Sequence, residues 1–242
     1  MFNANSVAGT FGAAVVAIAV LGAFAITVER ASSAEPAVAL PPPLAAETAG
    51  SVPAVEKVVL AGGCFWGVQA VFQHVNGVKE AVSGYAGGDK ETAAYAQVST
   101  GRTGHAESVE VTFDPHVVSY GTILKIYFSV AHNPTELNFQ GPDSGTQYRS
   151  EIFYESDEQK RAAEAYIAQL GAAKAFAAPI VTRVEALGSF YPAESYHQNY
   201  ATLNPDSPYI VYNDAPKVDN LGRLFPNQFR PKPKLVAVSD VN

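Results

Sequence analysis

A single cysteine, Cys64, constrains how this chain of 242 residues can hold a fold together. One thiol cannot form an internal disulfide, a zinc site built from several cysteines or a Cys-x-x-Cys pair. The fold must therefore be stabilised by burial of apolar side chains, and the composition provides them, because 48% of the residues are hydrophobic and only 16% are charged. Cys64 itself is structural, reactive, or paired with another molecule.

The amino-terminal region predicts a signal peptide or a membrane anchor over residues 1–28. Residues 7–28 contain no charged side chain, and as a helix they would span about 33 Å, close to the hydrocarbon thickness of a bilayer. Small residues at Ser32 and Ala34 suit cleavage before Glu35, whereas the length of the run and the lack of a preceding Lys or Arg leave an uncleaved anchor open. We expect export to the periplasm or cell envelope in preference to tethering in the cytoplasm.

The rest of the sequence divides into a linker, one domain and a tail. Residues 29–54 are rich in Ala and Pro and lack an apolar period, which predicts a semi-extended linker without a fold. Residues 55–215 suit a single domain. The polar, Pro-rich residues 216–242 are expected to form a tail that is wrapped or loose. With a net charge of −7 and only 16 Lys and Arg side chains, the chain lacks a basic surface for nucleic acid.

Apolar periodicity predicts alternating strands and helices in the domain. The run 58–61 is typical of a buried strand that enters a turn at residues 62–63, and a helix follows that ends at Asn76-Gly77. The remaining predicted elements are a strand over 78–85, a half-buried strand over 107–113, a helix over 123–131, a helix from the capping box of Ser156 and Gln159 to Leu170 with Gly171 just past its end, and a strand over 180–184. This order indicates an α+β or α/β fold.

Cys64 is predicted to lie where a strand ends and a helix begins. The unpaired N–H groups of a helix N-terminus shift a thiol towards the thiolate, and the neighbouring glycines let another molecule approach the backbone. Two aromatic residues, Phe65 and Trp66, follow the cysteine directly. These features favour a reactive thiol in a pocket over a small buried hydrophobe.

Glu107 is a candidate general acid. By the alternation of its strand it shares a face with the apolar Val109 and Val111, and a carboxyl group on a core-facing edge tends to keep its proton. A strand-end glutamate in water is an equally good interpretation of the pattern. Asp143 and Tyr148 lie in a loop rich in turn residues, which suits either ligand binding or a solvated turn.

Two histidines could form a hydrolytic pair with the cysteine. His105 and His197 have the side chain that a Cys-His hydrolase or acyltransferase needs, although neither has a diagnostic spacing from Cys64. The five scattered histidines show no metal-binding motif, so we expect no metal site. A structural role is the ordinary expectation for each histidine.

Five motifs occur in order along the domain: GCFWG at 63–67, GYAGG at 84–88, TGHAE at 103–107, GTQYRS at 145–150 and YHQNY at 196–200. Together they resemble the A-type peptide methionine sulfoxide reductases, and the resemblance runs from about Val58 to Lys217. It implies a ferredoxin-like α+β core, a mixed or antiparallel sheet flanked by helices, and no metal or organic cofactor. It also implies reduction of the S epimer of methionine sulfoxide, free or in oxidised proteins, and we expect a monomer.

The resemblance implies roles for seven residues. These are Cys64 as the nucleophile, Glu107 as the acid that protonates the oxygen, Tyr95, Tyr148 and Asp143 as groups that help to hold it, and Phe65 and Trp66 as the walls around the substrate methyl. The sulfenic acid formed on Cys64 would condense with a second thiol.

The chain departs from many family members because it has no resolving cysteine. The second thiol must then come from outside, from a thioredoxin or from a glutaredoxin with a small thiol such as glutathione. Two other classes stay open on the sequence alone. One is a cysteine hydrolase or acyltransferase that uses His105 or His197, and the other is a non-enzymatic protein of the cell envelope.

Overall fold

The computed structural model describes residue 1, residues 36–44 and residues 53–237. The predicted signal peptide or anchor therefore lies outside the described residues, apart from Met1. Within the described ranges, every helix is too short or too polar to span a bilayer.

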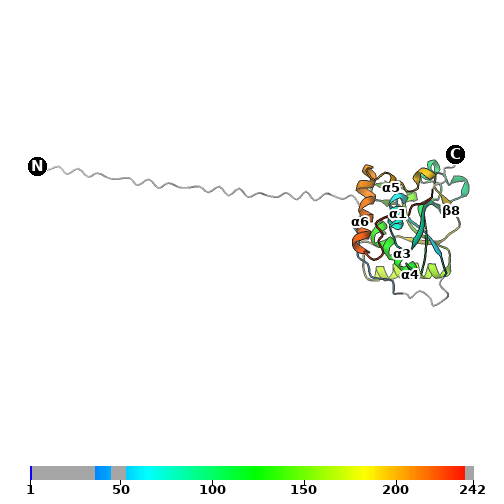
Figure 1. Ribbon diagram of the computed structural model, residues 1–242, viewed down its shortest axis with the longest axis horizontal. Helices are drawn as coiled ribbons and strands as arrows, with labels where there is room; N and C mark the ends of the chain where they lie inside the picture. The colour runs from blue at the N-terminus through cyan, green and yellow to red at the C-terminus, as the bar shows by residue number, and fades with distance from the viewer. Residues whose placement is uncertain (2–35, 45–52, 238–242) are drawn as a thin grey trace. The chain divides into compact units, whose positions relative to one another are not determined.

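A six-stranded sheet forms the centre of the domain (Figure 1). Its strands lie in the order β7-β6-β1-β3-β2-β8, and all neighbours are antiparallel except β6 and β7. The bounds are β1 Glu56–Gly62, β2 Val78–Ala86, β3 Ala106–Phe113, β6 Ser150–Tyr154, β7 Arg183–Ala186 and β8 Phe190–Pro192. The succession β1-α1-β2-β3-α3-β6, with spatial order β6-β1-β3-β2, is the predicted ferredoxin-like arrangement.

Helices and short segments connect the strands. The longer helices are α1 Phe65–Gln73, α3 Tyr120–Ile126, α4 Asp157–Ala172 and α6 Ala215–Leu224. The shorter elements are η1 Lys90–Thr92, α2 Tyr95–Val98, η2 Tyr127–Ala131, β4 Phe139–Gln140, β5 Asp143–Ser144, η3 Thr146–Tyr148, η4 Ser195–His197, α5 Tyr200–Leu203 and η5 Ile210–Asp214.

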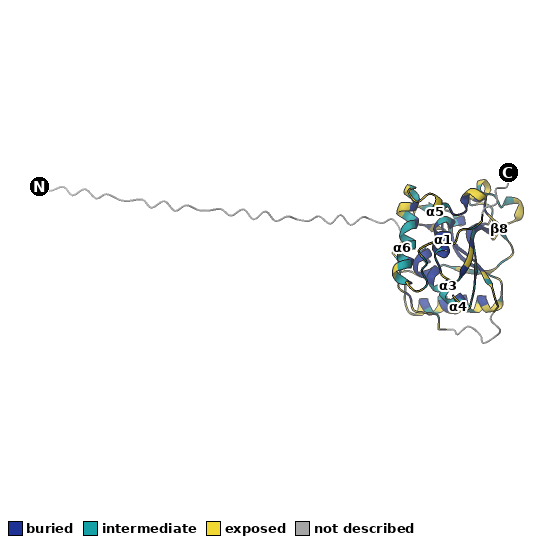
Figure 2. Ribbon diagram, viewed as in Figure 1, coloured by how far each residue is buried: buried dark blue, intermediate teal, exposed yellow. Residues whose placement is uncertain are grey.

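The alternation of side chains along β1 divides the apolar interior in two. Val58 and Leu60 belong to a large core with side chains of α1, α3 and α4, whereas Val59 and Ala61 belong to a small cluster with Phe153. Figure 2 shows both buried and exposed residues along α4, as expected for a helix that covers the large core with one face.

Two predicted boundaries were wrong, the end of α4 and the start of β7. The Ser156 hydroxyl accepts the Gln159 N–H at 3.2 Å as expected, but α4 runs past Gly171 to Ala172. Lys174 is the residue in the left-handed conformation, with φ of +50°. Its N–H bonds the Gly171 carbonyl, and the Ala175 N–H bonds the Leu170 carbonyl. These two bonds form a Schellman cap further along the chain than predicted.

The last predicted strand starts later than expected. Val181 donates its N–H to the carbonyl of Pro134 at 2.8 Å, so this part of the chain pairs with a loop, and β7 begins only at Arg183.

Part of the expected linker packs on the domain. Residues 36–44, here called the N-terminal strap, bury Leu40, which is 6% exposed, and the Pro41 carbonyl accepts a hydrogen bond from the Tyr166 hydroxyl at 2.7 Å. Further bonds join Val38 to Ser129, and both Pro42 and Leu44 to Gln169. Proline-rich backbone lacks N–H groups but keeps its carbonyls, and these accept bonds from α4.

The expected tail is wrapped onto the domain and begins as a helix. α6 packs against α1, Leu221 is fully buried, and the Arg230 guanidinium donates to the carbonyls of Val75 and Val78. Pro216 near the start of α6 is a helix-initiation signal that could have revealed this helix.

Candidate active site

Cys64 lies at the N-cap of α1, directly after the turn that ends β1. Gly63 makes this turn with φ of +85°, and a Cβ there would lie 2.6 Å from the Cβ of Gln140, so only glycine fits. The cysteine is 9% exposed. Burial raises the pKa of its thiol well above the ordinary value, and the nearby Glu107 and Asp214 raise it further.

The predicted shift of Cys64 towards the thiolate is therefore wrong. The Trp66 N–H does lower the pKa of the thiol, as expected at a helix N-terminus. Burial and the surrounding carboxyl groups outweigh this single bond, so the thiol keeps its proton at neutral pH.

Glu107 is buried at the beginning of β3, with 2% of its surface exposed. Its carboxyl oxygen Oε2 accepts the backbone N–H of Phe65 at 3.1 Å, which places it beside the first turn of α1. Burial raises the pKa of Glu107 to about 8. Of the two sequence interpretations, the core-facing carboxyl is the one found, and it is mostly protonated at neutral pH.

Tyr95, Tyr148 and Asp143 come from two segments around this pair, because Tyr95 begins α2 whereas Asp143 and Tyr148 lie in the connection between β4 and β6. Burial raises the pKa of both tyrosines, and the charges of Glu107, Cys64 and Asp143 raise it further, so all five groups lie close enough to interact. Burial also raises the pKa of Asp143, although a hydrogen bond from the Tyr209 hydroxyl opposes the change.

The two aromatic residues after Cys64 differ in exposure. Phe65 is 1% exposed and packs its ring edge-on against His197. Trp66 is half-buried and stacks on Tyr200 with ring centroids 3.8 Å apart, while Tyr209 meets its edge. Trp66 can therefore face a ligand directly, whereas Phe65 supports the wall from behind.

The two histidines of the hydrolase hypothesis bond to other groups. His105 Nε2 lies 3.0 Å from the carbonyl of Asp89, and His197 Nδ1 lies 3.2 Å from the indole nitrogen of Trp66. The other ring nitrogen of each histidine has no hydrogen-bond partner within the described part of the chain. A Cys-His pair is not formed.

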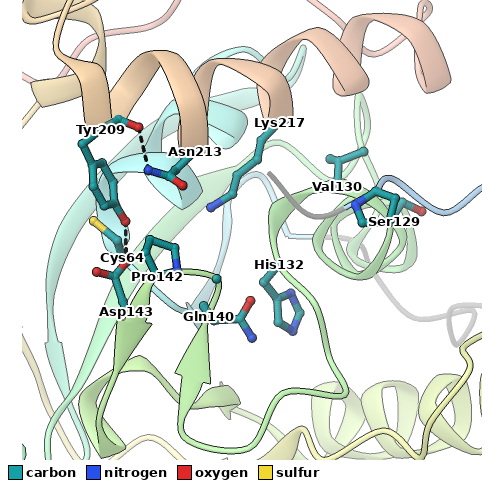
Figure 3. A pocket seen from close by; sticks show the side chains of 12 residues that line it. Cys64, Ser129, Val130, His132, Gln140, Pro142, Asp143, Tyr209, Asn213 and Lys217 are labelled. Carbon is teal, nitrogen blue, oxygen red and sulfur yellow. Dashed lines mark hydrogen bonds between the residues drawn. The ribbon is translucent and has the colours of Figure 1, made fainter. Parts of the chain in front are cut away.

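A cavity of about 30 Å³ reaches Cys64 from the side of α6 and the β4–β5 hairpin (Figure 3). The ammonium group of Lys217 points into this cavity and pairs with Asp214, at 3.3 Å from Oδ1. Tyr209 lines the cavity with its hydroxyl on Asp143. Within the described residues, no group of three His, Cys, Asp or Glu side chains could hold a metal ion.

Sequence reasoning missed four polar residues around the site, which are Glu194, Tyr209, Asp214 and Lys217. Three of them follow α5 in a segment without clear apolar periodicity. The Pro216 signal for α6 could have drawn attention to Asp214 and Lys217, but no local pattern marks Tyr209 or Glu194.

The family model for peptide methionine sulfoxide reductase matches residues 56–228. The chain belongs to this family. A relative from Mesorhizobium japonicum, peptide methionine sulfoxide reductase MsrA 2, is 64% identical over 186 residues, which cover 77% of this chain and 95% of the relative. A second MsrA 2, from Synechocystis, is 52% identical and covers 74% of this chain and 82% of the relative.

Solved structures agree with the sequence comparison. Methionine sulfoxide reductase A of Corynebacterium diphtheriae is 34% identical, with a TM-score of 0.56 over 71% of this chain and 85% of that structure. Mxr1 from Saccharomyces cerevisiae in reduced form is 32% identical, with a TM-score of 0.57 over 63% and 87%. The reductase is thus an oxidoreductase that reduces methionine sulfoxide and acts in protein repair, and the predicted family and α+β fold are confirmed.

Proposed function

We propose that the reductase converts the S epimer of methionine sulfoxide, free or within oxidised proteins, to methionine through a sulfenic acid on Cys64. The observation that carries this mechanism is the buried Glu107, whose carboxyl group keeps its proton at neutral pH beside the helix turn that presents the thiol. A neutral acid next to a nucleophilic sulfur is what protonation of a sulfoxide oxygen requires.

The chemical step balances within this pair of groups. The Cys64 sulfur attacks the sulfoxide sulfur and forms an S–S bond, while Glu107 gives its proton to the oxygen. The hydroxyl group then passes to the Cys64 sulfur. Its bond to the substrate sulfur and the S–S bond both break, which leaves a sulfenic acid on Cys64 and a thioether as the product. The proton released by the thiol restores the Glu107 carboxyl. Cys64 is oxidised by two electrons and the substrate sulfur is reduced by two.

The surrounding residues would bind the substrate. The hydroxyls of Tyr95 and Tyr148 can donate hydrogen bonds to the sulfoxide oxygen, since burial keeps both protonated. Asp143, fixed by Tyr209, would help to orient them. Trp66, supported by Phe65, offers an apolar surface to the methyl group.

An external thiol completes the cycle. The chain has no second cysteine, so the sulfenic acid condenses with a thiol of another molecule, releasing water, and a second external thiol reduces the mixed disulfide. A thioredoxin, or a glutaredoxin with glutathione, has this chemistry, and no prosthetic group is needed. The apolar residues 7–28 support a location in the periplasm or cell envelope, exported or tethered.

The proposal is tested with separated S and R epimers of a methionine sulfoxide peptide and dithiothreitol as the reductant. We expect turnover of the S epimer alone, loss of turnover in Cys64→Ser, and a dimedone adduct on Cys64 when sulfoxide is added without reductant. Turnover by Cys64→Ser would show that Cys64 is not the nucleophile. A stable acyl-enzyme with an ester substrate, without a sulfenic acid, would support the hydrolase instead.

A further inference from the structure

Tyr95 lies in the connection between two neighbouring strands of the sheet. It is the first residue of α2, which has only four residues, between β2 and β3. The first N–H groups of a helix have no partner within the helix, and the N-cap residue Ala94 has no side chain that could accept one. The Tyr95 N–H is therefore available to an acceptor from another part of the molecule.

Glu194 supplies this bond from a position 99 residues further along the chain. Its Oε1 accepts the backbone N–H of Tyr95 at 2.9 Å. Its Oε2 accepts the hydroxyl of Tyr85 at 2.8 Å. Tyr85 is fully buried on β2, so the same carboxylate joins the loop of Tyr95 to the central sheet.

The segment that carries Glu194 is itself fixed to β2. The Ala193 N–H donates to the Ser83 carbonyl at 2.9 Å, and the Gln198 side chain bonds both the N–H and the carbonyl of Ser83, at 3.0 and 2.8 Å. Within the same segment, the ring of His197 packs against the Tyr95 ring with centroids 4.5 Å apart. The segment that supports Tyr95 is therefore bonded to the central sheet.

We propose that Glu194 is a positioning residue for the reductase reaction, which holds the Tyr95 main chain so that its hydroxyl meets the sulfoxide oxygen. This inference rests on the proposed role of Tyr95. The side chain at position 194 must bond both the Tyr95 N–H and the Tyr85 hydroxyl. Glutamine meets it, since its oxygen can accept the Tyr95 N–H while its amide donates to the Tyr85 oxygen, whereas alanine meets neither need.

Two measurements test the inference. The first is amide hydrogen exchange at Tyr95, which reports the bond itself and does not depend on activity. We expect faster exchange in Glu194→Ala, near wild-type exchange in Glu194→Gln, and no change in the control Glu164→Ala, whose exposed side chain lies on α4. Unchanged exchange in Glu194→Ala would overturn the positioning contact.

The second measurement is a double-mutant cycle on kcat/KM for the S sulfoxide. Tyr95→Phe and Glu194→Ala are each expected to lower kcat/KM by roughly tenfold, mainly through kcat. The double variant should fall no further than the single ones, because both changes take away the same contact between the Tyr95 hydroxyl and the sulfoxide oxygen. Glu194→Gln should restore most of the rate. A multiplicative double variant, or full activity in Glu194→Ala, would overturn the inference.

The results for the wild type and the variants distinguish a failure of this inference from a failure of the proposed function. An inactive wild-type protein would refute the proposed function, and a fully active Tyr95→Phe would refute the role of Tyr95 and the inference with it. A slow Tyr95→Phe beside a fully active Glu194→Ala would refute the inference alone.

Discussion

Replacing Glu107 with glutamine is expected to stabilise the reductase while removing most of its activity. The structure raises the pKa of Glu107 from its ordinary value of 4.5 to about 8, because the carboxyl group is almost fully buried. Between these two values the folded state binds a proton that the unfolded state releases, so the free energy of unfolding falls as the pH rises.

The size of this effect follows from the shift. Each unit of pKa corresponds to about 1.4 kcal/mol, so the wild-type protein should lose on the order of 5 kcal/mol between pH 4.5 and pH 8 through this group. Glutamine does not ionise, and its oxygen can still accept the Phe65 N–H. The stability advantage of Glu107→Gln should therefore be near its minimum at pH 4.5 and reach its full value above pH 8.

Denaturant unfolding of both proteins at pH 5, 7 and 9, followed by circular dichroism, measures this difference. The comparison across pH matters more than the value at any one pH, because burial of the amide adds a constant that cancels. A difference in unfolding free energy that does not change with pH would show that Glu107 ionises normally. That result would remove the physical basis for its role as an acid.

Activity should change in the opposite direction. Without a proton to transfer, Glu107→Gln is expected to form methionine at least about 100-fold more slowly in a single turnover with excess enzyme. The more stable protein would then be the slower one, as expected where an active site keeps an ionisable group buried at the expense of stability.

Three further substitutions test other parts of the structure. Gly63→Ala should destabilise the fold by at least about 2 kcal/mol in denaturant unfolding, because φ is +85° and the new Cβ meets Gln140; a wild-type unfolding midpoint would contradict the close contact. Tyr209→Phe removes the hydrogen bond that lowers the pKa of Asp143, so kcat/KM for the sulfoxide should fall several-fold with the fold intact, and an unchanged value would show that this pair has no part in the reaction. Gln169→Ala should weaken docking of the N-terminal strap and lower the free energy of unfolding by about 1 kcal/mol. Increased proteolysis near residue 44 is the direct measurement, and protection from proteolysis equal to that of the wild type would contradict the docked strap.

Local patterns predicted much of the sheet and its helices. The alternation of Val109, Val111 and Phe113 marked β3 because one face of that strand is buried, and the capping box at Ser156 marked the start of α4. These features depend only on neighbours in sequence. The motifs around Cys64 and Glu107 likewise pointed to residues that the fold brings together.

What the sequence could not predict depends on distant contacts. Tyr95 is held by Glu194, and Asp143 is bonded by Tyr209, across 99 and 66 residues respectively. The raised pKa of Cys64 results from burial among acidic groups of three different segments, which no local rule for a helix N-terminus contains.

Docking of the N-terminal strap also shapes the surroundings of the thiol. Pro36, near the start of the strap, lines the same cavity as Cys64. Tyr166 and Gln169 of α4 hold the strap through the carbonyls of Pro41 and Pro42. A change that detaches the strap from α4 would remove Pro36 from the cavity wall and open the surroundings of Cys64 to solvent.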